Sequence, residues 1–275
     1  MKYIKDKEWL VNHLHDHDVR VVDCRFSLAQ PNKGHEDYLT SHLPGASFFD
    51  LEKDLSKPAS VHGGRHPLPD VAGFVEKLAN AGIDEHMTIV AYDHGEGAFA
   101  SRFWWMLRYL GHEKVFILDG GFKEWTEANY LVKTEIPQFK KSNFSIHLQD
   151  KMIADIGVVK EAILNHQDSV ILIDSREEKR FLGIEEPIDK KAGHIPTAIN
   201  KPWFEGFHKG LMKQADEQKR RFADIEPEKQ IIVYCGSGVT AAPNFLALKE
   251  AGYENVRLYV GSFSDWISYE ENEIN

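Results

Sequence analysis

Short apolar runs alternate along the chain with stretches whose apolar residues recur at helical spacing. The runs at residues 19–23, 88–92, 169–174 and 231–234 are rich in Val and Ile, as expected for strands that are buried on both faces. The stripe of apolar residues between positions 103 and 110 has helical spacing and is typical of core packing. We therefore predict an α/β fold with mainly parallel sheets, each flanked by helices on both faces.

The two halves of the chain carry the same signals in the same order, which indicates an internal repeat. The run at 19–23 matches 169–174, and the run at 88–92 matches 231–234. Two further pairs match, namely His42-Leu43-Pro44-Gly45-Ala46 with His194-Ile195-Pro196-Thr197-Ala198, and Gly120-Gly121-Phe122-Lys123-Glu124-Trp125 with Gly261-Ser262-Phe263-Ser264-Asp265-Trp266. A polar segment that contains Pro137 separates the two halves of the chain. We expect domains at 1–132 and 149–275 with a linker at 133–148.

A single cysteine follows the last of these strands and begins a polar loop. The loop reads Cys235-Gly236-Ser237-Gly238-Val239-Thr240, and a helical pattern follows it in which Pro243 is tolerable only in the first turn. Glycines allow successive backbone N–H groups to turn inward, and the start of a helix adds partial positive charge. The loop therefore favours the thiolate form of Cys235.

Two other interpretations of this loop are less favoured. A buried core cysteine is the commoner fate of a free thiol, but a core position rarely requires two glycines close to the thiol, as Gly236 and Gly238 are here. A cysteine phosphatase or arsenate reductase needs an arginine in the loop to hold the anion, and residues 235–248 contain no Arg or Lys. The loop suits a cysteine that carries one extra sulfur atom as a persulfide.

On these motifs the sequence resembles the tandem-domain rhodanese superfamily of sulfurtransferases over nearly its whole length. The loop Cys-Gly-Ser-Gly-Val-Thr is similar to that of the 3-mercaptopyruvate branch, whereas the thiosulfate branch usually has a basic pair in place of Gly236-Ser237. The resemblance implies two rhodanese-like domains, of which the first is catalytically inactive. Asp93 stands in that domain where Cys235 stands in the second, and its loop also contains Glu96.

The resemblance also assigns a donor-binding arginine. Arg180 lies just beyond the strand end at Asp174, where the ligands of open α/β sheets bind, and its planar guanidinium can hold an acid group with two bonds. A solvated charge is the alternative. Mercaptopyruvate enzymes tend to carry a second arginine after Glu-Pro, but here Ile188 follows Glu186-Pro187, and Lys190 or Lys191 is a less exact substitute.

A Ser-His-acid relay is the third element that the resemblance implies. Its positions correspond to Ser237 in the loop, to His66 before Pro67, and to Glu52, which replaces a more usual Asp. The relay would polarise or protonate the substrate while the thiolate takes the sulfur. The alternative for His66 is a purely structural role in a glycine- and proline-rich loop. The backbone N–H groups of Gly236, Gly238, Val239 and Thr240 would stabilise the sulfur anion.

Composition limits the partners and the compartment. The formal net charge of −10 disfavours nucleic acid, and no apolar run is long enough for a membrane span or a signal peptide. The only cysteines are Cys24 and Cys235, which fits reducing conditions and a cytoplasmic location. Cys24 has no glycine nest and favours a structural role. His13, His15 and His17 form a cluster with Asp16 and Asp18, and such an alternation near a helix end is more typical of solvated surface than of a metal site.

The sequence therefore predicts a sulfurtransferase with 3-mercaptopyruvate as its favoured donor. Cys235 would take the sulfane sulfur of a small anionic donor and pass it to cyanide or a small thiol, or to thioredoxin, without a metal or an organic cofactor. Two alternatives stay open, namely a thiosulfate sulfurtransferase and a persulfide carrier or protein-binding module without catalytic turnover.

Overall fold

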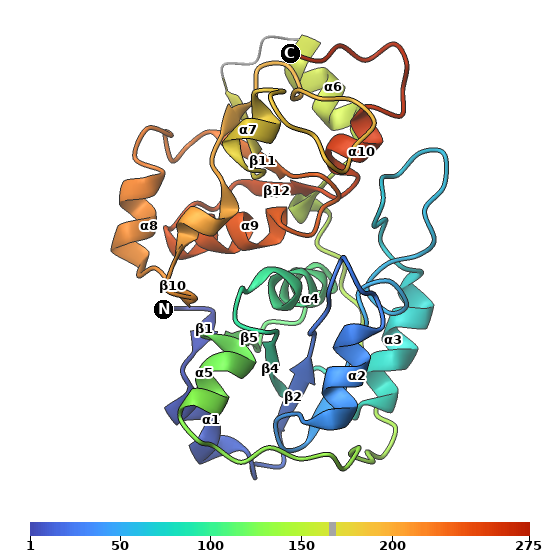
Figure 1. The fold of residues 1–275 in the computed structure, drawn as a ribbon, viewed down its shortest axis with the longest axis vertical. Coiled ribbons are helices and arrows are strands. Elements are labelled where there is room, and N and C mark those ends of the chain that lie inside the picture. Colours follow the sequence, from blue (N-terminus) through green and yellow to red (C-terminus); the bar gives the residue numbers. More distant parts are fainter. Residues whose placement is uncertain (165–168) are drawn as a thin grey trace. The chain divides into compact units, whose positions relative to one another are not determined.

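The computed structural model describes residues 1–164 and 169–275, which form two compact units (Figure 1). The first unit comprises residues 1–57, 68–149 and 209–212, and the second comprises residues 58–67, 150–208 and 213–275. Two short segments, 58–67 and 209–212, therefore belong to a different unit from the residues on either side of them in the sequence. Segment 58–67, which includes His66, belongs to the second unit.

A parallel sheet forms the centre of the first unit. Its strands are β1 (Ile4–Lys5), β2 (Val19–Asp23), β3 (Ala46–Phe48), β4 (Thr88–Tyr92) and β5 (Val115–Leu118). Within the described residues the sheet has five strands in the order β1-β5-β4-β2-β3, and all neighbours are parallel. The central strand β4 therefore ends immediately before Asp93.

Helices cover both faces of this sheet because successive strand residues point to opposite sides. The helices are α1 (Lys7–His13), α2 (Lys33–Thr40), α3 (Val71–Asn80), α4 (Ala98–Tyr109) and α5 (Gly121–Glu127). Leu10 of α1, Tyr38 of α2 and Trp125 of α5 share one core cluster with strand residues. On the other face α4 packs on β4 and β5, and Phe74 of α3 contacts Phe103 of α4.

The second unit repeats this topology. Its sheet contains β6 (Ile153–Ala154), β7 (Val170–Asp174), β8 (Ile199–Asn200), β11 (Gln230–Tyr234) and β12 (Val256–Tyr259). The strand order is β6-β12-β11-β7-β8, and all neighbours are parallel. Two further short strands are β9 (Phe207–His208), in the second unit, and β10 (Leu211–Met212), in segment 209–212 of the first unit. The predicted α/β class with parallel sheets is thus confirmed.

The helices of the second unit also lie on both faces of its sheet. They are α6 (Ile156–Leu164), α7 (Glu178–Phe181), α8 (Ala215–Arg221), α9 (Ala241–Glu250) and α10 (Ser262–Trp266), with 3₁₀ turns at Asp150–Met152 and Trp203–Gly206. Val159 of α6 and Phe263 of α10 share a core cluster with Ile232. Helix α9 packs on β11 and β12, with Pro243 in its first turn.

A buried acid–arginine pair connects the loops at the carboxyl edge of the first sheet. Asp23, at the end of β2, accepts from the Arg25 guanidinium at 2.7 Å and from the Tyr92 hydroxyl at 2.5 Å. The Arg25 guanidinium also donates to Ser41 O at 2.7 Å and lies 4.0 Å from the ring centroid of Phe122. The pair therefore joins β2, β4, α5 and the loop before β3.

The second sheet has the same arrangement at the equivalent positions. Asp174 accepts from Arg176 at 2.6 Å, and Arg176 donates to Gly193 O at 2.7 Å and lies 4.0 Å from the ring centroid of Phe263. The hydroxyl of Tyr234 accepts from the backbone N–H of Ile195 at 3.2 Å. The internal repeat thus extends from sequence order to the buried polar contacts.

The segment predicted as a linker, residues 133–148, contains no helix or strand among its described residues apart from an isolated bridge between Lys133 and His42. It runs along the first unit, where Ser142 Oγ donates to Ile83 O at 2.5 Å and His147 N donates to Leu110 O at 2.9 Å. The domain boundaries expected at residues 132 and 149 stay a prediction.

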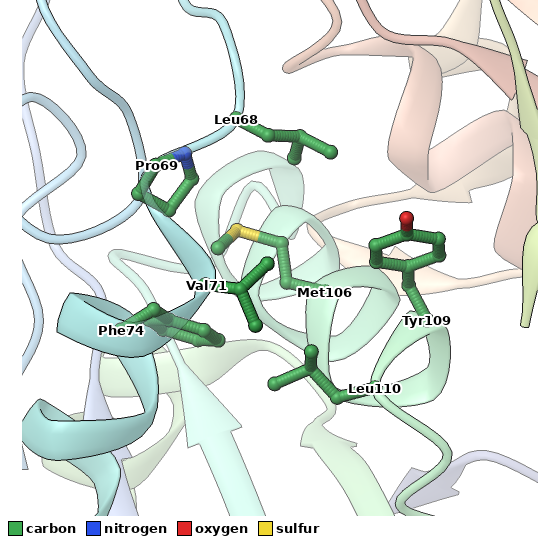
Figure 2. Close-up of a pocket in the computed structure, with 7 residues that line it drawn as sticks. All are labelled: Leu68, Pro69, Val71, Phe74, Met106, Tyr109 and Leu110. Atoms are coloured by element: carbon green, nitrogen blue, oxygen red, sulfur yellow. The ribbon is translucent and has the colours of Figure 1, made fainter. Parts of the chain in front are cut away.

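A small apolar pocket lies in the first unit beside α3 and α4 (Figure 2). Its volume is about 20 Å³, and Met106 and Leu110 of the predicted apolar stripe point into it. The lining residues are Leu68, Pro69, Val71, Phe74, Met106, Tyr109 and Leu110. None of them is a cysteine or another residue of the predicted site.

Asp23→Asn is expected to lower the free energy of unfolding by about 3–5 kcal/mol, because it leaves the Arg25 guanidinium buried without its counter-charge. Urea denaturation measures the loss. The control is Glu127→Gln, which removes an acid from the exposed Lys123–Glu127 pair and should cost less than about 1 kcal/mol. Equal losses in the two variants would show that the Asp23–Arg25 pair does not hold the unit together.

Candidate active site

Cys235 lies at the carboxyl end of the central strand of the second sheet. It follows β11 directly, and residues 235–240 form an irregular loop that ends at the start of α9. Open parallel sheets bind their ligands at this edge, where the carboxyl ends of the strands lie. The residue is 1% exposed, so its thiol is nearly sheltered from bulk water.

Local hydrogen bonds fix the thiol. The backbone N–H of Gly238 donates to Cys235 Sγ at 3.1 Å, and Gly238 has a φ of +77°, which favours glycine. Ser262 Oγ accepts from Cys235 N at 3.1 Å, lies 4.0 Å from Sγ, and donates to Tyr259 O at 2.8 Å. Ser262 has a φ of +56°, close to the +54° of its counterpart Gly121. These side-chain contacts compensate for a backbone conformation that serine rarely adopts.

Two guanidinium groups from other parts of the second unit lie over the loop. A Cβ built on Gly236 would be 2.8 Å from Nη2 of Arg65 and 3.5 Å from Nη2 of Arg180. Burial lowers the pKa of Arg65, and among nearby charges Cys235 is the one that raises it most. The loop itself carries no cation, but two arginines from distant parts of the sequence supply positive charge beside it.

Acidic side chains hold both guanidiniums. Arg180 donates to Glu186 at 2.8 Å and 3.1 Å and to Asp189 at 2.8 Å, and Arg65 forms an ion pair with Asp189. The side chain of Arg180 is 15% exposed and that of Arg65 is 32% exposed. Arg180 is therefore not a solvated charge. Its predicted role in donor binding stays a prediction.

His66 contacts the loop serine. Its Nδ1 lies 2.8 Å from Ser237 Oγ, and both side chains are buried. Val239 is also buried, and Thr240 precedes the first residue of α9.

Glu52, the third residue of the predicted relay, belongs to the first unit, where its side chain is exposed. The second unit thus brings together Cys235, Ser237, His66 and Arg180.

The first unit shows what the equivalent loop can bind. The carboxylate of Asp93 accepts four backbone N–H bonds, from Gly95 and Phe99 at 3.0 Å, from Gly97 at 2.9 Å and from Ala100 at 3.2 Å. Successive N–H groups that converge in this way form an anion-binding nest. In the first unit a carboxylate of the chain itself fills the nest.

Sequence reasoning missed Arg65, Asp189 and Ser262 as neighbours of the thiol. Arg65 directly precedes His66 in a glycine- and proline-rich segment, and this position is the one signal in the sequence that points to it. Asp189 directly follows Ile188, the position at which mercaptopyruvate enzymes tend to carry their second arginine, and no other signal in the sequence points to it. Ser262 was hidden inside a repeat motif whose first copy has glycine there.

Two stretches of the chain, residues 6–128 and 158–269, match the model of the rhodanese-like domain. The chain is 38% identical over 265 residues to a probable 3-mercaptopyruvate sulfurtransferase from Pseudomonas aeruginosa, covering 94% of this chain and 93% of that protein. It is 31% identical over 258 residues to the thiosulfate sulfurtransferase of Bos taurus, covering 90% of this chain and 84% of that protein. The crystal structure of SseA from Escherichia coli, which concerns the rhodanese fold and the mechanism of 3-mercaptopyruvate sulfotransferases, aligns with a TM-score of 0.85 and 33% identity over 96% of this chain and 100% of that one.

Iodoacetamide at neutral pH is expected to label Cys235 and to leave Cys24 unmodified in the folded protein. Burial raises the pKa of the Cys24 thiol well above its usual value, and nearby carboxylates, Asp23 first, raise it further, so Cys24 stays protonated. Peptide mass spectrometry locates the label, and the unfolded protein, in which both thiols react, is the control. Preferential labelling of Cys24 would contradict the assignment.

Proposed function

The chain belongs to the rhodanese-like family, with two copies of the domain in tandem, and we propose that it is a sulfurtransferase that carries sulfane sulfur on Cys235. This agrees with the resemblance of its motifs. The proposal rests on one observation, a buried thiol that receives an N–H bond from Gly238 while the guanidiniums of Arg65 and Arg180 lie beside the same loop. A thiolate and a bound anionic donor both need this combination of N–H groups and positive charge.

The first half-reaction loads sulfur onto the enzyme. The Cys235 thiolate attacks the sulfur of 3-mercaptopyruvate, an S–S bond forms, and the C–S bond breaks. Its electron pair leaves with carbon as the enolate of pyruvate, which then takes up a proton. Arg180 binds the carboxylate of the donor and orients its sulfur toward Sγ. The persulfide remains on Cys235, and the N–H groups of residues 236–240 stabilise its negative charge.

Ser237 and His66 act on the keto group of the donor. With Nδ1–H of His66 donating to Ser237 Oγ, the serine hydroxyl is free to donate to the keto oxygen as negative charge develops there. Glu52 is the acid of this relay on the strength of the family resemblance alone. Thiosulfate has no keto group, so this pair of residues favours 3-mercaptopyruvate as the donor.

The second half-reaction returns the thiol. The thiolate of an acceptor, or cyanide, attacks the outer sulfur, and Cys235 leaves as a thiolate, which gives ping-pong kinetics. Small thiols and thioredoxin are the proposed thiol acceptors. We place the reaction in the cytoplasm, because both cysteines are unpaired in the fold. Among the described residues, none of the helices has the length and apolar character needed to cross a bilayer.

Incubation with 3-mercaptopyruvate is expected to add one sulfur, about 32 Da, to the Cys235 peptide, which mass spectrometry detects. Cys235→Ser should abolish turnover, because an alkoxide is far less accessible than a thiolate, and Cys24→Ser should retain most of it. Comparison of kcat/KM should favour 3-mercaptopyruvate over thiosulfate. The reverse preference would establish the thiosulfate alternative, and a persulfide without turnover would indicate a carrier.

His66→Ala is expected to reduce kcat with 3-mercaptopyruvate by about a hundredfold, the usual contribution of a positioned proton donor, and to affect thiosulfate much less. Ser237→Ala should give the same pattern, and the double variant should be no worse than either single one, because the two side chains act as one unit. Steady-state kinetics with both donors measures the effect. Equal losses with both donors would remove the relay from the mechanism.

A further inference from the structure

A buried carboxylate lies between the two guanidinium groups at the active-site loop. The Asp189 side chain is 2% exposed, its Oδ2 accepts from Arg180 Nη2 at 2.8 Å, and its Oδ1 pairs with Arg65. A Cβ on Gly236 would lie 3.4 Å from Oδ2. The carboxylate therefore borders the same space above the loop as the guanidiniums.

Asp189 balances the local charge. The ion pairs in this part of the unit are Arg176–Asp174, Arg176–Glu186, Arg180–Glu186, Arg180–Asp189 and Arg65–Asp189. The three guanidiniums are thus matched by three carboxylates. Removal of Asp189 would leave one more positive charge than negative charge around the loop.

The second cation of the site comes from an unexpected segment. Lys190 and Lys191, which follow the departure at Ile188, are both exposed. Arg65 instead reaches the loop from segment 58–67 and shares Asp189 with Arg180. The acid that both arginines contact therefore controls how much positive charge a donor meets.

We propose that Asp189 is a specificity-determining residue that selects against doubly charged sulfur donors. The inference rests on the proposed sulfurtransferase function. A donor that reaches Cys235 meets two guanidiniums whose N–H groups already bind Asp189. The Asp189 carboxylate also repels the acid group of that donor. A dianion such as thiosulfate experiences twice the repulsion of a monocarboxylate such as 3-mercaptopyruvate.

A purely structural role makes a different prediction. Asp189 lies in an irregular stretch between α7 and β8, and its two ion pairs also anchor that stretch. If anchoring were its only contribution, its loss would impair both donors equally, whatever their charge. The ratio between the donors therefore distinguishes the two roles.

The test is Asp189→Asn, which removes the charge and keeps the shape. We expect KM to fall by about threefold for 3-mercaptopyruvate and by about tenfold for thiosulfate, because the repulsion energy doubles with donor charge and the factor is squared. The kcat of each donor should change by less than about twofold. Steady-state kinetics at low ionic strength, where screening is weak, gives both constants.

Two further variants serve as controls. Glu185→Gln removes the same charge from an exposed acid that pairs with Lys179, and it should leave the donor ratio at the wild-type value. Arg65→Gln combined with Asp189→Asn removes one charge of each sign from the loop. It should return the donor ratio toward that of the wild type, because the local charge is balanced again.

Alkylation of Cys235 provides a readout that needs no sulfur donor. Iodoacetate is an anion and iodoacetamide is neutral, so the ratio of their reaction rates reports the charge around the thiol. Asp189→Asn should raise this ratio about threefold, and Glu185→Gln should leave it unchanged. An inactive wild type would refute the proposed function, but this measurement would still test the role of Asp189.

An unchanged donor ratio together with an unchanged alkylation ratio in Asp189→Asn would overturn the inference. An equal rise in KM for both donors would also overturn it and would assign Asp189 to anchoring. A raised alkylation ratio with a shift of the donor ratio toward thiosulfate supports it.

Discussion

The geometry around Cys235 depends on the buried Asp174–Arg176 pair. Its guanidinium binds Gly193 O and lies against the ring of Phe263, whose backbone N–H donates to Cys235 O at 3.0 Å. One cation thus connects the end of β7, the loop before β8 and the start of α10 to the loop that carries the thiol. In the first unit the equivalent pair supports a loop that holds the Asp93 carboxylate, so the framework does not depend on which of the two side chains its loop carries.

Much of the fold was predictable because its signals are local. The apolar runs at 19–23 and 231–234 coincide with or nearly match β2 and β11, and the matching order of motifs indicated the duplicated topology. Pro243 correctly marked the beginning of a helix, since its missing N–H is tolerated there. The assignment of residues 58–67 to the second unit has no periodic signal in the sequence, because it depends on long-range packing.

The candidate active site also combines local signals, which the sequence shows, with long-range contacts, which it does not. Cys235 and its glycines lie within one short loop, so their relation was visible in the sequence, and the contact between His66 and Ser237 was suggested only by family resemblance. Arg65 and Asp189 are 124 positions apart and meet only in the folded chain. Charge counted along the loop therefore gave an incomplete account of charge in space.

Because Arg65 and His66 precede the first unit's helix α3 in sequence yet belong to the second unit, the second half of the chain does not encode its own site in full. A fragment cut at the duplication boundary would keep the thiol and lose both of these side chains. Asp93 stands in the first unit where Cys235 stands in the second, yet the first half of the sequence supplies Arg65 and His66 to the second unit. That dependence gives natural selection a direct reason to retain the fused pair.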